Sequence, residues 1–122
     1  MRARRVLLLL ALIQCGKHVS KAPIVPGGNA ERGKMAVSKY GCGSCHAIPG
    51  IPSARGLVGP PLEDVGRRSY IAGVLPNEPE NIVRWIRNPP AVDDKTAMPF
   101  LGVSEQDARD IAEFLYRLKN RK

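Results

Sequence analysis

The chain has 122 residues, of which 43% are hydrophobic and 25% charged, which is the composition of a globular protein. Its length is that of one domain and argues against a second domain. With one Trp, three Tyr and two Phe against 12 Gly and 11 Pro, it offers little large apolar surface for a core, and a bound prosthetic group would supply the constraint that domains of about 100 residues often need. The net charge is +8, but the Arg-rich run lies at the N-terminus and neither a basic helix nor an aromatic platform follows it, which argues against a nucleic-acid partner.

The start of the chain has the order of a secretion signal. Three arginines, Arg2, Arg4 and Arg5, precede an uncharged run of eight apolar residues, Val6 to Ile13. Because a helix needs about 20 apolar residues to cross a bilayer, this run is predicted to be the core of a signal peptide and not a permanent span. We therefore expect the protein to be exported to the periplasm.

Two cleavage sites remain open, and the signal peptide is assigned to residues 1–22. Cleavage after Gln14 would follow a lipobox-like sequence, in which Gln14 replaces the usual small residue. It would leave Cys15 for a lipid anchor, which would tether the protein to the periplasmic face of the inner membrane. Cleavage after Ala22 would leave no such anchor, although Pro23 then lies just past the scissile bond.

Residues 23–28 are rich in Pro and Gly and are predicted to be a linker, so the folded domain is expected over residues 29–122. Asn29 is a suitable N-cap for a helix over residues 30–40, in which Glu31 in the first turn and a lysine in the last match the helix dipole. The side chains expected on its inner face are Met35, Ala36 and Tyr40.

The middle of the chain is predicted to be mostly loop. Residues 47–59 are dense in Gly and Pro, and a short helical turn is expected between Leu62 and Gly66. A second helix is expected from Glu78 or Pro79 to Arg87, ended by an Asn-Pro-Pro sequence. The residues spaced to bury one side of this helix are Ile82, Val83, Trp85 and Ile86.

The last helix has the strongest pattern in the chain. Ser104 and Asp107 form a capping-box start. Apolar residues then recur at helical spacing, and sustained alternation of apolar and polar residues is absent from the sequence. The protein is therefore predicted to be all-α, with about three main helices, short turns and long loops. The apolar residues of the last helix are Ile111, Phe114, Leu115 and Leu118.

The chemistry is expected at residues 42–46, which read Cys-Gly-Ser-Cys-His, the arrangement of c-type haem attachment. Because residues i and i+3 share a face of a helical turn, Cys42 and Cys45 can bond the two vinyl groups on one porphyrin edge. His46 then follows as an axial ligand of the iron. A zinc site would need about four ligands, and a thioredoxin-like dithiol would need a βαβ context that is missing here. A disulfide between the two cysteines before haem addition also remains open.

A second axial ligand must come from the few remaining candidates, Met35, Met98 and His18. Met35 lies eleven residues before His46 on the preceding helix, too near in sequence to reach across the ring. Met98 lies in a Pro-bounded loop after a helix and is the predicted ligand. His/Met ligation occupies both axial positions and favours electron transfer over ligand activation.

The order of these features resembles class I cytochrome c, namely a helix, Cys-x-x-Cys-His, Gly-Pro-x-Leu, a helix ended by Asn-Pro, a Met loop and a final helix. The resemblance covers about residues 28–120. Residues 41–118 are also similar to the haem domains found as subunits of, or fused to, bacterial terminal oxidases. The resemblance implies the class I cytochrome c fold around one covalent haem c. The sequence differs from the animal mitochondrial pattern in the Pro-rich loop over residues 48–59.

The resemblance also implies roles for single residues. The carbonyl of Pro60 would receive the hydrogen bond of the His46 ring, and Leu62 would pack against the porphyrin. Trp85 would lie near Met98, and Arg67 would pair with a haem propionate. A last implied feature is a close crossing of the first and last helices at Gly33, with Ile111 and Phe114 on the other side.

These features predict a protein that transfers electrons and is not itself an enzyme, either a soluble carrier or a tethered relay subunit of a respiratory chain. The partners expected are redox proteins, with a cytochrome bc1-type donor or a terminal oxidase as acceptor. Without residues 1–14 the chain keeps 16 basic and 11 acidic residues, and this net charge of +5 would steer it toward an acidic partner. The alternatives are a gas sensor or peroxidase-like enzyme with a labile distal ligand, and a subunit whose haem only stabilises the fold.

Overall fold

The structure is a computed structural model, and it describes residues 24–118. The predicted signal peptide, both cleavage sites, the lipid anchor at Cys15 and the candidate ligand His18 lie outside the described residues. Within the described range, no helix has the length and apolar character that a membrane crossing requires.

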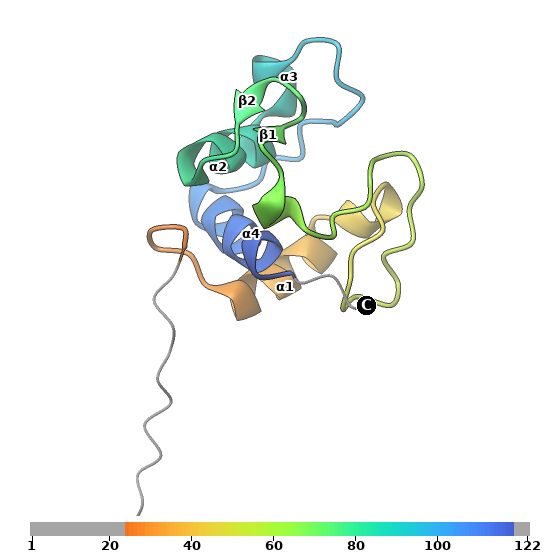
Figure 1. Cartoon of the computed structure of the whole chain (residues 1–122). Coiled ribbons are helices and arrows are strands. Elements are labelled where there is room, and N and C mark those ends of the chain that lie inside the picture. Colours follow the sequence, from red (N-terminus) through yellow and green to blue (C-terminus); the bar gives the residue numbers. More distant parts are fainter. Residues whose placement is uncertain (1–23, 119–122) are drawn as a thin grey trace, which may run out of the picture.

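The fold is built on the contact between its first and last helices, α1 (Ala30–Lys39) and α4 (Glu105–Arg117) (Figure 1). Both begin at the residues that the sequence predicts. The Asn29 side chain caps α1 by accepting a hydrogen bond from the backbone N–H of Arg32, and Ser104 caps α4 in the same way from Asp107. Each cap satisfies a backbone donor that the helix leaves unpaired.

The two helices cross at Gly33, as the resemblance implies. A Cβ atom at Gly33 would lie 1.9 Å from the carbonyl oxygen of Asp110 and 2.8 Å from Cβ of Phe114, so only glycine permits this separation. The resemblance implied that Ile111 and Phe114 lie opposite Gly33. In the structure the nearest residues of α4 are Asp110 and Phe114.

The buried face of α1 differs from the predicted one. It consists of Gly33, Ala36 and Val37, which follow the i, i+3, i+4 spacing. Met35 was predicted to face inward but is 66% exposed, because it lies outside this stripe. Tyr40 is half-buried, and its hydroxyl donates to Oδ2 of Asp107 at 2.7 Å.

The residues before α1 pack against α4 instead of forming a free linker. Val25 is fully buried, and its backbone N–H donates to Oε2 of Glu113 at 2.8 Å. The backbone N–H of Asn29 donates to Oδ1 of Asp110 at 2.8 Å, and the Arg32 guanidinium binds both oxygens of the same carboxylate. Both carboxylates are almost fully buried and fully hydrogen-bonded, so they anchor residues 24–29 on α4.

Helix α2 (Pro79–Arg87) has the predicted bounds, and the short helix α3 (Pro89–Val92) follows it. The Asn-Pro-Pro segment is predicted to end a helix. In the structure it ends α2 and also begins α3. Proline has no N–H to lose in the first turn of a helix, and the side chain of Asn88 caps α3 by accepting from the backbone N–H of Ala91.

A small two-stranded sheet, β1 (Tyr70–Ile71) and β2 (Leu75–Pro76), was not predicted. Two residues per strand are too few to produce a visible alternation. The turn between the strands places Ala72 at φ 51° and Gly73 at φ 74°, in the left-handed region. The short helical turn expected between Leu62 and Gly66 lies slightly later, as the 3₁₀ helix η2 (Val65–Arg67), which includes Gly66.

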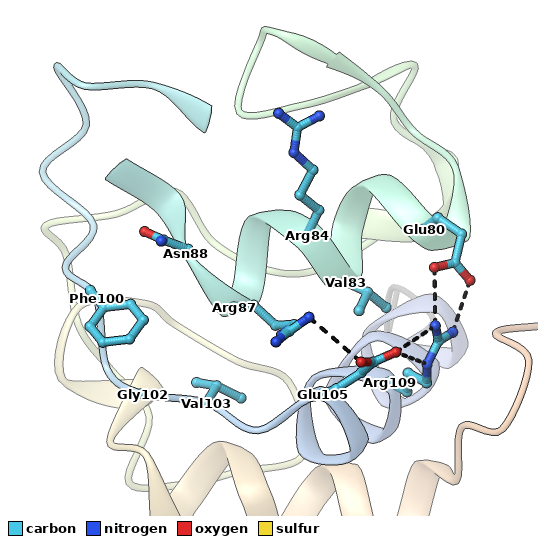
Figure 2. Close-up of a pocket in the computed structure, with 10 residues that line it drawn as sticks. All are labelled: Glu80, Val83, Arg84, Arg87, Asn88, Phe100, Gly102, Val103, Glu105 and Arg109. Atoms are coloured by element: carbon cyan, nitrogen blue, oxygen red, sulfur yellow. Dashed lines mark hydrogen bonds and ion pairs between the residues drawn. The ribbon is translucent and has the colours of Figure 1, made fainter. Parts of the chain in front are cut away.

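A cluster of ion pairs joins α2 to α4 at the surface (Figure 2). Arg109 of α4 lies 2.8 Å from a carboxylate oxygen of Glu80 on α2 and 3.0 Å from one of Glu105. The hydrogen bond from Arg109 holds the pKa of Glu80 below its usual value. The cluster borders a surface pocket of about 450 Å³.

Gly33→Ala is expected to destabilise the folded protein by about 1 to 3 kcal/mol, because the added methyl group would overlap the backbone of α4 and force the helices apart. Chemical unfolding of the haem-loaded protein would measure this. The control is Lys34→Ala, an exposed change on the same helix that should alter the free energy of unfolding by less than about 0.5 kcal/mol. Equal stabilities of the two variants would contradict the role assigned to Gly33.

Candidate haem-binding site

The Cys-x-x-Cys-His segment forms a tight turn directly after α1. Gly41, at φ 69°, ends the preceding helix and leads into the 3₁₀ helix η1 (Cys42–Ser44). The carbonyl of Cys42 then accepts from the backbone N–H of Cys45 at 3.3 Å and of His46 at 3.1 Å. Local hydrogen bonds thus fix the relative positions of the two thiols and the imidazole.

These three side chains line one cavity of about 820 Å³, within the size range of cofactor pockets. The wall is mostly apolar and includes residues of α1, α2 and α4, among them Ile111 and Leu115 of α4. All of the predicted site residues except Arg67 line this cavity. They are Cys42, Cys45, His46, Pro60, Leu62, Trp85 and Met98.

The imidazole of His46 is oriented by a backbone carbonyl. Its Nδ1 lies 2.7 Å from the carbonyl oxygen of Pro60, the contact that the resemblance implies. This carbonyl can only accept, so Nδ1 carries the proton and Nε2 keeps a lone pair available to a metal.

Three glycines bring the loop over residues 47–59 against the attachment segment, which sequence reasoning missed. A Cβ at Gly56 would lie 2.3 Å from the carbonyl carbon of Cys45, and one at Gly59 would lie 2.3 Å from Cε1 of His46. One at Gly43 would lie 2.7 Å from Cα of Ala54. The sequence shows a Gly-rich loop, but only the structure shows which glycines lie in contact with the site.

Of the two methionines in the described residues, Met98 lines the cavity and Met35 does not. The loop that carries Met98 is held locally, since the backbone N–H of Met98 donates to Oγ1 of Thr96 at 3.1 Å. A soft thioether and an imidazole therefore face the same apolar cavity, as His/Met ligation of a haem requires.

The cavity is not lined by Arg67, the predicted propionate partner, but by its neighbour Arg68. Nη2 of Arg68 donates to the carbonyls of Pro61 and Glu63. The helical turn of η2 ends between the two arginines, and at Arg68 the backbone becomes extended, with ψ 145°. The sequence marks an arginine pair but not which member faces inward.

A hydrogen-bond network behind Arg68 fixes its backbone. The side-chain amide of Asn77 donates to the carbonyls of Arg68 at 2.7 Å and Val65 at 2.8 Å. Its oxygen accepts from the hydroxyl of Tyr116 on α4 at 2.8 Å. Burial raises the pKa of Tyr116 to about 12, so the phenol stays protonated and remains a donor at neutral pH.

Two observations on the described residues concern the other uses considered for the cysteines. Within residues 24–118, no group of three or more His, Cys, Asp and Glu side chains is arranged to hold a metal ion, as a zinc site requires. The Cys42 and Cys45 thiols are free, and burial raises the pKa of Cys42. A reactive dithiol needs the opposite shift, toward the thiolate.

Comparison with known proteins identifies the class. The family model described as "Cytochrome c" matches residues 30–119. The chain is 34% identical over 91 residues to a cytochrome c oxidase subunit 2 of Alkalihalophilus pseudofirmus, and 31% identical over 104 residues to one of a Bacillus species. These alignments cover 74% and 82% of this chain but only 26% and 29% of the relatives, so the chain spans about a quarter of their length.

Two solved structures share the fold. One is SoxXA from P. pantotrophus, with a TM-score of 0.59, 21% identity and coverage of 81% of this chain and 85% of that one. The other is cytochrome c2 from Rhodobacter sphaeroides, with a TM-score of 0.57, 21% identity and coverage of 78% and 99%. The fold is therefore that of class I cytochrome c, as predicted, and residues 24–118 form four α-helices, two 3₁₀ helices and one small sheet.

This chain belongs to the cytochrome c family, whose members transfer electrons through a covalently bound c-type haem. It has the class I cytochrome c fold, and its sequence is similar to part of two proteins named cytochrome c oxidase subunit 2. The residues around the cavity fit that group, because two thiols, an imidazole and a thioether line an apolar wall of suitable size.

Gly59→Ala is expected to disturb the proximal side of the site, because the new methyl group would overlap the His46 ring. The absorption spectrum of the haem-loaded variant should show partial loss of the low-spin bands. Gly50→Ala is the matched control, since its added Cβ meets nothing within 4 Å although φ is 82°. It should lower stability by about 1 kcal/mol and leave the spectrum unchanged. An unaltered spectrum for Gly59→Ala would show that His46 does not depend on this contact.

Proposed function

We propose that this protein carries a single haem c, attached through Cys42 and Cys45 with His46 and Met98 as axial ligands, and that it works as a one-electron carrier or relay subunit of a respiratory chain. The observation that carries the proposal is the meeting of these four side chains in one apolar cavity. When bound, the haem supplies an iron that gains and loses one electron.

The residues of the chain then keep that exchange simple. Pro60 holds the proton of His46 on Nδ1, so the imidazole keeps one orientation in both oxidation states. The apolar side chains of the cavity would limit the access of water to a bound haem, and Met98 would supply a thioether ligand to its iron. Arg68, braced by Asn77, is the side chain available to a propionate, in place of Arg67. No side chain in this arrangement is needed to transform a substrate.

The comparisons support a place beside a terminal oxidase. The two sequence relatives are named cytochrome c oxidase subunit 2, and this chain matches about a quarter of their length. We propose a terminal oxidase as the acceptor and a cytochrome bc1-type complex as donor, with the protein in the periplasm. A lipid anchor on Cys15 would place it at the inner membrane.

The first test is the absorption spectrum of protein produced with haem-attachment machinery, recorded oxidised, reduced, and reduced with carbon monoxide. The expected result is a set of low-spin bands, the weak far-red feature of Met–iron ligation, and no response to carbon monoxide. Ready binding of carbon monoxide would instead favour the gas sensor or peroxidase-like enzyme.

Met98→Ala is expected to open the sixth position, so that the reduced variant binds carbon monoxide and its reduction potential falls. Met35→Ala is the control, because Met35 is 66% exposed and does not line the cavity. Its spectrum and potential should match those of the parent protein. If Met98→Ala keeps the far-red feature, the sixth ligand is another residue.

A further inference from the structure

The segment that orients the imidazole of His46 consists of two prolines, Pro60 and Pro61. Because proline has no N–H, these residues can form backbone hydrogen bonds only through their carbonyl oxygens. The Pro60 carbonyl accepts from Nδ1 of His46 at 2.7 Å. The Pro61 carbonyl accepts from Nη2 of Arg68. The bond from Arg68 is therefore the restraint on this proline pair that lies next to the bond to His46.

The guanidinium of Arg68 holds the chain around the proline pair at two points. The nitrogen that binds the Pro61 carbonyl also donates to the carbonyl of Glu63 at 3.2 Å. An arginine side chain loses much rotational freedom when it is held in one place, so the two bonds need a fixed backbone at Arg68. That residue lies just past the end of η2, where the chain is already extended.

Asn77 supplies the fixed backbone. Its side-chain nitrogen uses both N–H groups, on the carbonyls of Val65 at 2.8 Å and of Arg68 at 2.7 Å, which lie at the two ends of η2. Its backbone N–H donates to the carbonyl of Ser69 at 3.0 Å. Three donors of one residue thus hold the segment that carries the guanidinium.

Tyr116 of α4 determines which way the amide of Asn77 faces. Its hydroxyl donates to Oδ1 of Asn77 at 2.8 Å, and this bond distinguishes the oxygen of the amide from the nitrogen. The ring lies against η2, since a Cβ at Gly66 would lie 3.3 Å from Cδ1 of Tyr116. A continuous set of hydrogen bonds therefore runs from the last helix to the carbonyl that binds the imidazole.

We propose that Tyr116 and Asn77 are positioning residues for His46. Acting through Arg68, they hold the proline pair so that its first carbonyl keeps the hydrogen bond to Nδ1 of the imidazole. The inference rests on the proposed function, in which His46 binds iron through Nε2. Because the hydrogen bond at Nδ1 fixes the orientation and basicity of a ligating imidazole, α4 acts on the iron ligand from the far side of η2.

The test measures hydrogen exchange of the His46 Nδ1–H by NMR in the reduced, haem-loaded protein at one pH. This proton exchanges when its bond to the Pro60 carbonyl opens. Asn77→Asp replaces both amide donors with a carboxylate and should speed the exchange by about fivefold, the equivalent of one net hydrogen bond. Tyr116→Phe removes only the hydroxyl, with no change of charge, and should speed the exchange by a smaller factor.

Asn81→Asp is the matched control. It makes the same change four residues along the chain, at a side chain that donates to the carbonyl of Pro76 at 3.0 Å and does not line the cavity. The exchange rate of His46 in this variant should equal that of the parent protein. The backbone N–H groups of α4 report global opening in each variant and serve as the internal reference.

Parent exchange rates at His46 in both Asn77→Asp and Tyr116→Phe would overturn the proposal. It would also be overturned by an acceleration equal to that of the α4 backbone N–H groups, which a loss of stability alone would produce. Tyr116→Phe keeps the test decisive where Asn77→Asp does not fold. Low-spin bands in the parent protein would leave the proposed function standing whatever these rates are, and their absence from the parent would overturn that function instead.

Discussion

The close approach of α1 and α4 is the constraint on which the rest of the structure depends. Because Gly33 has no side chain, the backbones of the two helices come together at Asp110. This contact sets the rotation of α4. Its Ile111 and Leu115 then face the cavity, its Asp110 and Glu113 bind the residues before α1, and its Tyr116 reaches Asn77. One helix thus supports the wall of the site, the N-terminal segment and the backbone behind Arg68.

The site itself is a second case of close backbone packing. The Cys-x-x-Cys-His turn and the loop after it lie in contact at three glycines, and the Pro60 carbonyl completes this contact at the His46 ring. A chain with so few aromatic residues gains rigidity here from backbone hydrogen bonds and close contact more than from large side chains.

Much of the architecture could be predicted from the sequence, because its signals are local. Helix caps at Asn29 and Ser104, the periodicity of α4 and the spacing of the attachment motif each act within one or two turns. What was missed depends on distant contacts. The buried state of Glu113, the inward choice of Arg68 over Arg67 and the exposure of Met35 are all set by the way separate elements pack. Local propensity carries no information on such choices.

The loop between Gly56 and Gly59 contains positions that differ in how freely they can be substituted. The glycines at its ends cannot vary without disturbing Cys45 or His46, whereas the side chain of Leu57 between them is 92% exposed and does not line the cavity. Substitutions can therefore accumulate at Leu57 while the backbone around Cys45 and His46 stays the same. The outer surface beside the attachment turn can diverge between relatives at this position without a change in the cofactor environment.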